Sequence, residues 1–177
     1  MKIKPLLLVL FITVLSINSY AQELINCTPE KSFWVIKNGS KTYALTLADS
    51  KATVKETQLI YNNIAINYEF IDIDSNGIND TETNMLINYM VKISSQHRIP
   101  NTTVETKIQN KDGKHLLRIV TPSEKARLIV ATTINGKLLS LTTNRPEPGD
   151  LANVEDVLEK IILSGSEIDS TDNLCNK

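Results

Sequence analysis

The sequence predicts an α+β fold, in which a mostly antiparallel sheet, built from hairpins, packs against two helices in a single domain. Three observations support this fold class. Apolar and polar residues alternate along most of the chain with the two-residue period of a half-buried strand. Turn sequences such as Asn38-Gly39, which is typical of a tight hairpin, separate neighbouring segments. The period of a helix occurs in only two stretches, so strands dominate the prediction.

The N-terminal half is expected to form two hairpins. Ser32–Lys37 is rich in aromatic and β-branched residues, and Lys41–Leu47 alternates after the Asn-Gly turn. Thr53–Tyr61 and Ile64–Ile71 make the second hairpin around Asn62-Asn63. The last of these strands has one continuous apolar face, which consists of Ile64, Ile66, Tyr68 and Phe70.

The first predicted helix runs from Thr81 to about His97. The residues of its inward stripe recur three or four positions apart, as on one face of a helix, and are Leu86, Met90, Ile93 and His97. Pro100 ends this helix because the residue before a proline is disfavoured in the α region.

Four more strands are expected after the helix. Thr102–Gln109 and Lys114–Thr121 pair about a turn that contains a glycine. Arg127–Ile134 and Lys137–Thr143 pair about Asn135-Gly136. The chain therefore contains about eight predicted strands.

The second predicted helix begins at Asp150, whose side chain is expected to cap it, and continues to about Ser164. Gly165 is placed to end it. Its apolar face consists of Leu151, Val154, Val157, Leu158, Ile161 and Ile162. The acidic residues of this helix are expected on its solvated face, and they are Glu155, Asp156 and Glu159.

The order of these elements resembles that of PsbP/Mog1-like domains, which are α/β/α sandwiches. The strand Leu128–Thr133, an Asn-Gly turn, the strand Leu138–Thr142 and a closing helix into Leu163-Ser164 carry the resemblance. The hairpin within Gln58–Phe70 fits the same order. That family includes photosystem accessory, Ran-binding and bacterial envelope proteins, and most of its members lack evident catalytic machinery. The resemblance therefore implies a binding or accessory role.

The first 21 residues predict a secretory signal peptide. Lys2 and Lys4 form a basic start, an apolar run extends over Leu6–Ile17, and the small residue Ala21 marks the expected cut. The run is shorter than the roughly 20 apolar residues that span a bilayer. Residues 22–177 are therefore expected to form one domain in the periplasm or outside the cell, without membrane insertion.

The chain has two cysteines, Cys27 and Cys175, which flank the expected domain. Thiols in an oxidising compartment usually pair, and domain termini often lie close together. A disulfide is therefore predicted, and closing so long a loop would stabilise the fold by up to about 5 kcal/mol in the chain-entropy model. The alternative is two free thiols, which non-reducing mass spectrometry would detect.

The stretch between the strand Ile64–Ile71 and the first helix has a chemical signature of its own. Oxygen-bearing side chains alternate along it, and Gly77 permits a sharp turn. It resembles the calcium loops of EF-hands and thrombospondin type-3 repeats. The resemblance implies a Ca²⁺ site with six ligands, which are Asp72, Asp74, Asn76, the carbonyl of Ile78, Asp80 and Glu82.

The acidic loop departs from the EF-hand at its twelfth position, which is Thr83 and not glutamate. The missing bidentate ligand predicts weak binding, roughly 0.1–1 mM. The alternative is an ordinary strand-to-helix turn in which Asp80 or Thr81 caps the helix. Calorimetric titration with calcium distinguishes the two interpretations.

No catalytic arrangement emerges from the sequence. The two histidines, His97 and His115, lack the spacing of a zinc site, and no nucleophile elbow or phosphate-binding glycine loop is present. The formal net charge of −1 gives no reason to expect nucleic acid or an anionic membrane as a partner.

The predicted function is that of an exported, non-enzymatic binding or accessory protein of the bacterial cell envelope, whose partner is a protein or another envelope component. Two alternatives stay open. One is a periplasmic immunity-type protein that neutralises an antibacterial toxin, which a neighbouring toxin gene would favour. The other is a small secreted hydrolase, which a deep pocket with converging carboxylates and a histidine would favour.

Overall fold

The computed structural model describes residues 22–49, 51–71, 81–96, 104–121 and 126–176. These residues build an α+β domain dominated by antiparallel sheets, so the predicted fold class is confirmed. None of the described helices is long and apolar enough to cross a membrane.

The described residues form eleven strands, two α-helices and one short 3₁₀ helix. The strands are β1 (Gln22–Thr28), β2 (Lys31–Asn38), β3 (Lys41–Leu47), β4 (Thr53–Lys55), β5 (Gln58–Tyr61), β6 (Ile64–Ile71), β7 (Glu105–Lys111), β8 (Lys114–Val120), β9 (Arg127–Ile134), β10 (Lys137–Asn144) and β11 (Ser166–Ile168). The helices are α1 (Glu82–Gln96), α2 (Leu151–Leu163) and the 3₁₀ helix η1 (Leu174–Asn176).

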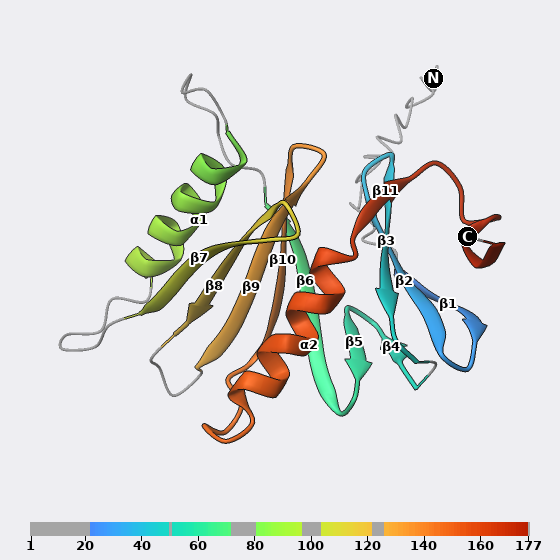
Figure 1. The fold of residues 1–177 in the computed structure, drawn as a ribbon, viewed down its shortest axis with the longest axis horizontal. Helices are drawn as coiled ribbons and strands as arrows, with labels where there is room; N and C mark the ends of the chain where they lie inside the picture. The colour runs from blue at the N-terminus through green and yellow to red at the C-terminus, as the bar shows by residue number, and fades with distance from the viewer. Residues whose placement is uncertain (1–21, 50, 72–80, 97–103, 122–125, 177) are drawn as a thin grey trace, which may run out of the picture.

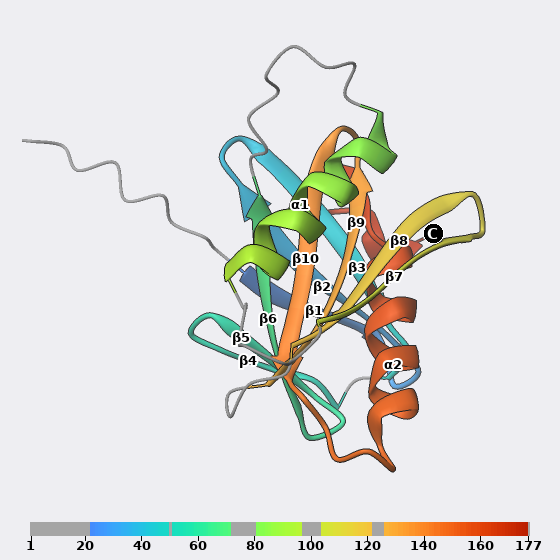
Figure 2. The ribbon, with the colours of Figure 1, turned by 90° about the vertical axis from the view of Figure 1, so that its left-hand side faces the viewer.

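The strands make two sheets of unequal size. The small sheet has four strands in the order β1-β2-β3-β11, and the large sheet has seven in the order β4-β5-β6-β10-β9-β8-β7. Helix α1 lies on one face of the large sheet, whereas α2 and the small sheet lie on the other (Figure 1). Seen from the α1 side, the helix crosses the large sheet at an angle to its strands (Figure 2).

The main core lies between the two sheets and α2. The fully buried side chains of Trp34 on β2, Leu139 on β10 and Ile162 on α2 belong to one apolar cluster. Burying such side chains is the dominant favourable term in folding. This cluster therefore holds the two sheets and α2 together.

A second cluster forms beneath α1. Leu86 and Tyr89 of the helix pack with Leu117, Ile129 and Leu138 from three strands of the large sheet. The helix packs mainly against β8 and β9. The helix therefore covers the apolar part of this face, and no described helix lies over the part of β5, β6 and β10 that is farther from it.

Three departures from the predicted strands share one cause: pairing with a neighbouring strand, and not an alternating sequence pattern, forms these strands. β1 and β11 were not predicted, because neither has an alternating apolar face, and each is an edge strand of the small sheet. The predicted strand Thr53–Tyr61 is two strands, β4 and β5, that pair with each other. The chain reverses between them, where Glu56 has φ 49°.

The backbone groups at the ends of α2 find hydrogen-bond partners other than the predicted ones. The side chain of Asp150 makes no capping hydrogen bond, and Gly165 does not have the left-handed conformation of a helix-ending glycine. The carbonyls of Leu163 and Gly165 instead accept hydrogen bonds from Lys114 Nζ, at 2.6 and 3.1 Å. A cation at this end also complements the helix dipole.

Gly165 is required for close packing. A Cβ atom at this position would lie 2.6 Å from Cδ1 of Ile134 and 3.0 Å from the carbonyl oxygen of Ile162. The neighbouring Ser164 accepts a hydrogen bond from the Thr46 amide at 2.8 Å and so joins the end of α2 to β3. The absence of a side chain at 165 therefore lets α2 sit close to the sheets.

We expect Gly165→Ala to lower the free energy of unfolding by about 1–3 kcal/mol, because the added methyl group overpacks the contact with Ile134 and the backbone of Ile162. Urea denaturation followed by tryptophan fluorescence measures the change. Gly149→Ala is the matched control, since no atom lies within 4 Å of a Cβ added there. Equal stability of the two variants would contradict the packing role.

Candidate functional site

Most of the predicted calcium loop lies outside the described residues. Asp72, Asp74, Asn76, Ile78 and Asp80 all fall there. The sixth predicted ligand, Glu82, is exposed and begins α1. The described ranges contain no group of three or more histidine, cysteine, aspartate or glutamate residues that could hold a metal ion. Calcium binding therefore stays a prediction.

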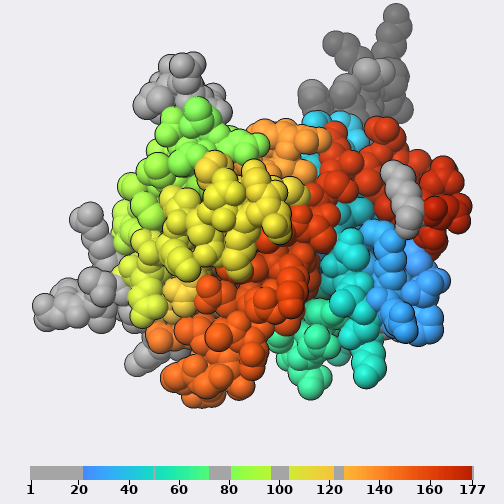
Figure 3. Space-filling view, viewed as in Figure 1, coloured from blue at the N-terminus to red at the C-terminus, as the bar shows by residue number. Residues whose placement is uncertain are grey.

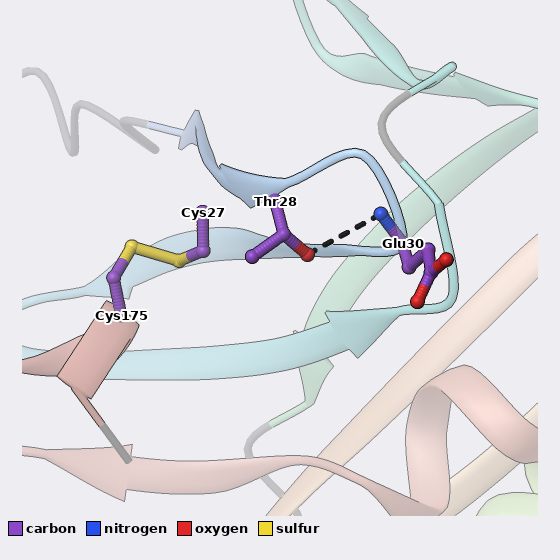
Figure 4. Close-up of a disulfide and its surroundings, with 4 residues drawn as sticks. All are labelled: Cys27, Thr28, Glu30 and Cys175. Atoms are coloured by element: carbon purple, nitrogen blue, oxygen red, sulfur yellow. Dashed lines mark hydrogen bonds between the residues drawn. A yellow bond between two sulfur atoms is a disulfide. The ribbon is translucent and has the colours of Figure 1, made fainter.

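The two cysteines are joined as predicted. Cys27 on β1 and Cys175 on η1 form a disulfide with their Cα atoms 5.1 Å apart (Figure 4). Cys27 lies at an irregularity in the β1–β2 pairing, between Asn26 and Thr28. The hydroxyl of Thr28 then accepts a hydrogen bond from the Glu30 amide at 3.3 Å in the turn that follows.

The histidines do not contribute to a described site. His97 lies outside the described residues. His115 lies on β8, where its backbone carbonyl accepts a hydrogen bond from the Thr132 hydroxyl at 2.7 Å.

An open groove of about 510 Å³ lies on the large sheet. We call it the polar groove. It is lined by residues of four strands, which are Gln58, Asn67, Tyr68, Glu69, Arg127, Thr142, Thr143 and Asn144. Amide, hydroxyl, carboxylate and guanidinium groups are all represented, so the lining offers both hydrogen-bond donors and acceptors.

Strand register explains why these side chains meet. Gln58, Asn67 and Thr142 lie opposite one another on β5, β6 and β10, so all three point to the same face. That face is the one carrying α1, because Ser140, two residues before Thr142, bonds to Tyr89 of the helix. The polar groove therefore occupies the part of the sheet that α1 leaves uncovered.

A chain of hydroxyl groups runs from beneath α1 into the polar groove. The Tyr89 hydroxyl donates to Ser140 Oγ at 3.2 Å, and Ser140 Oγ lies 3.5 Å from Thr142 Oγ1. Burial raises the pKa of the Tyr89 phenol, the hydrogen bond to Ser140 lowers it, and the Glu69 carboxylate raises it further. The net pKa is above its ordinary value, so Tyr89 stays protonated and remains a donor.

A second polar site lies between α2 and the edge of the large sheet, and it corrects one prediction. Glu159 is not solvated: it is only 4% exposed. Its carboxylate accepts hydrogen bonds from Lys111 Nζ and, at 2.7 Å, from Gln109 Nε2. The hydrogen bond to Glu159 raises the pKa of Lys111, so the lysine stays protonated.

Glu155 is also not fully solvated, because its side chain faces the large sheet. Its carboxylate accepts a hydrogen bond from Arg118 Nε at 2.6 Å, and Arg118 also approaches Glu105 at 3.6 Å. Asp156 is exposed, as predicted. Glu159 and Glu155 are matched by cations of β7 and β8, so these two carboxylates seat α2 on the sheet.

Comparisons with known proteins add little to this geometry. No protein-family model matches the chain, and no curated protein matches its sequence. Among solved structures, the chain is similar to the solution structure of cyanobacterial PsbP (CyanoP) from Synechocystis sp. PCC 6803, with 12% identity and a TM-score of 0.40, over 85% of this chain and 94% of that one. A TM-score below 0.5 supports no functional inference, and the PsbP/Mog1-like assignment stays a prediction.

We expect Tyr89→Phe to lower the free energy of unfolding at neutral pH by about 1 kcal/mol, because it removes the hydrogen bond to the buried Ser140. The raised pKa of Tyr89 means that its contribution is fully present below the pKa of an unfolded tyrosine and is lost as pH rises through the folded pKa. Urea titrations at pH 7 and pH 11 should therefore show the gap between the two proteins narrowing at high pH.

Tyr43→Phe is the control for this experiment. The Tyr43 hydroxyl is buried and has no hydrogen-bond partner among the described residues. Its removal is therefore expected to be close to neutral at pH 7. A loss of similar size in both variants would show that the Tyr89 bond contributes nothing specific.

Proposed function

We propose that this chain is an exported binding protein that holds a polar partner, a protein segment or another envelope component, in the polar groove without catalysing a reaction. The observation that carries the proposal is the row formed by Gln58, Asn67 and Thr142 across three adjacent strands. Side chains on adjacent strands of a sheet are held about 4.8 Å apart by the backbone. Such a row presents donors and acceptors at fixed spacing to a ligand lying across the strands.

The charged groups of the polar groove support binding over proton transfer. Glu69 pairs with Ser140 on β10, whereas Arg127 pairs with Asn144, four positions further along the same strand. This spacing corresponds to about 13 Å along the strand. A general acid and base must both reach one reacting atom within hydrogen-bond distance. Two separated opposite charges instead favour recognition of an extended partner with its own complementary charges.

The disulfide supports a location in an oxidising compartment, which the chain would reach by export. Disulfides form and persist mainly in oxidising compartments. The Cys27–Cys175 bond joins the two ends of the described chain, so it forms only when the whole domain has been made. Together with the predicted signal peptide, this supports a periplasmic or secreted location.

The groove variant Gln58→Ala/Asn67→Ala/Thr142→Ala tests the proposal. All three residues are partly exposed, so the fold is expected to tolerate their truncation. We expect proteins or polymers that crosslink to the wild-type chain in a cell-envelope extract of the producing organism to decrease at least tenfold with the variant. Quantitative mass spectrometry of the crosslinked material measures this decrease.

The control variant is Asn88→Ala/Lys92→Ala/Gln96→Ala, which removes three exposed polar side chains from α1. It should retain the wild-type partners. Partners that are kept equally by both variants would contradict a role for the polar groove. A captured toxin would identify an immunity-type protein, and time-dependent cleavage of the captured partner would identify a hydrolase.

A further inference from the structure

The end of the chain folds back over the outer face of the small sheet. After β11, residues 169–176 lead to η1 and return to β1, where Cys175 bonds to Cys27. In the space-filling view this C-terminal segment, in red, lies at one end of the molecule beside the blue strands β1 and β2 (Figure 3). We call residues 169–176 the C-terminal segment.

The C-terminal segment covers apolar side chains that face away from the main core. Leu174, only 5% exposed, packs in one cluster with Phe33 and Val35 of β2 and with Ala44 of β3. Ile25 and Cys27 of β1 border the same cluster. Without the segment, these side chains would form an exposed apolar patch on the small sheet.

The point at which the C-terminal segment is anchored to the fold is β11. Glu167 accepts a hydrogen bond from Lys41 Nζ at 3.0 Å and another from Asn135 Nδ2 at 3.2 Å. Ile168 still pairs with Thr42 on β3. Strand pairing therefore holds the chain up to residue 168.

Beyond residue 168, the C-terminal segment makes few contacts with the other described residues. The side chain of Ser170 bonds to Asp172, and the amides of Leu174 and Asn176 bond to Thr171 and Asn173, so these hydrogen bonds are internal to the segment. Its attachment to the other described residues is made by the Leu174 side chain and the disulfide. One buried leucine does not offset the conformational entropy lost in ordering a whole segment.

We propose that the C-terminal segment is a redox-sensitive latch: reduction of Cys27–Cys175 releases residues 169–176 and bares the apolar face of the small sheet, while the core between the two sheets stays folded. Cys175 is exposed and Cys27 is half-buried, so the bond is open to attack from the Cys175 side. This inference does not depend on the function proposed for the polar groove.

The reductant is a protein or small-molecule dithiol. Its thiolate attacks Sγ of Cys175, breaks the S–S bond and releases the thiolate of Cys27. The second thiol of the reductant then displaces Cys175, so the reductant leaves as a disulfide and both cysteines as thiols. The two electrons gained by the protein disulfide are those lost by the dithiol.

Hydrogen exchange with mass spectrometry on the full chain tests the latch, with dithiothreitol as the dithiol. In the reduced wild type and in Cys27→Ser/Cys175→Ser, we expect the peptide covering residues 169–176 to exchange at least tenfold faster than in the oxidised protein. Peptides from β9 and β10 should keep their protection, and Trp34 fluorescence should not change. Binding of an apolar dye should increase several-fold on reduction.

The Cys27→Ser/Cys175→Ser variant, which dithiothreitol cannot change, is the control for direct effects of the reagent. Leu174→Asp with the disulfide intact separates the anchor from the bond, and it should raise exchange of the C-terminal segment less than reduction does. Three outcomes would overturn the latch: loss of protection throughout the sheets on reduction, unchanged protection of residues 169–176, or a disulfide that millimolar dithiothreitol leaves intact under native conditions.

Discussion

The large sheet has two faces, and the elements that cover them are unequal. The small sheet and α2 together bury one face, whereas α1 alone covers only the apolar side of the other. The part of a face that no described element covers is expected to be polar, because a large exposed apolar patch is costly in water. The position of the polar groove therefore follows from this imbalance: it begins where the cover supplied by α1 ends.

The helix that completes the main core is positioned by contacts at both its apolar and its polar sides. Ile162 and Leu158 enter the core, Gly165 allows close approach at one end, and Glu159 meets Lys111 on the opposite side. Lys111 is exposed, so solvent screens this ion pair and it adds little net stability. Its geometric requirement is strict, however, so it favours one rotation of α2 over others that would bury the same leucine and isoleucine side chains.

The sequence predicted those features that depend on neighbouring residues. The hairpin turn at Asn62-Asn63 was predictable because asparagine tolerates the positive φ that both residues adopt. The features it did not predict depend on pairs distant in the chain. Glu159 is acidic on a helix surface and was assigned to solvent, because nothing near it in sequence shows that Lys111 lies opposite.

The polar groove was missed for the same reason. Asn67 and Thr142 are ordinary alternating residues of two separate strands, and only the register between β6 and β10 places them side by side. The disulfide was predictable without any geometry, because two cysteines in an oxidising compartment leave one pairing. The disulfide also closes the C-terminal segment over an apolar sheet face. That arrangement was not predictable, because it depends on where β11 pairs, and β11 has no alternating sequence pattern.

The disulfide affects two equilibria, global unfolding and local opening of the C-terminal segment, and the free energies involved differ. In global unfolding it restricts the unfolded chain over 148 residues of separation, which the chain-entropy model converts to about 5 kcal/mol. In local opening the rest of the fold stays intact. The bond then opposes only the gain in conformational entropy of the C-terminal segment. Burial of one leucine supplies about 2 kcal/mol, whereas ordering backbone costs about 1–2 kcal/mol per residue. Local opening is therefore the first consequence of losing the bond, and the segment leaves before the sheets separate.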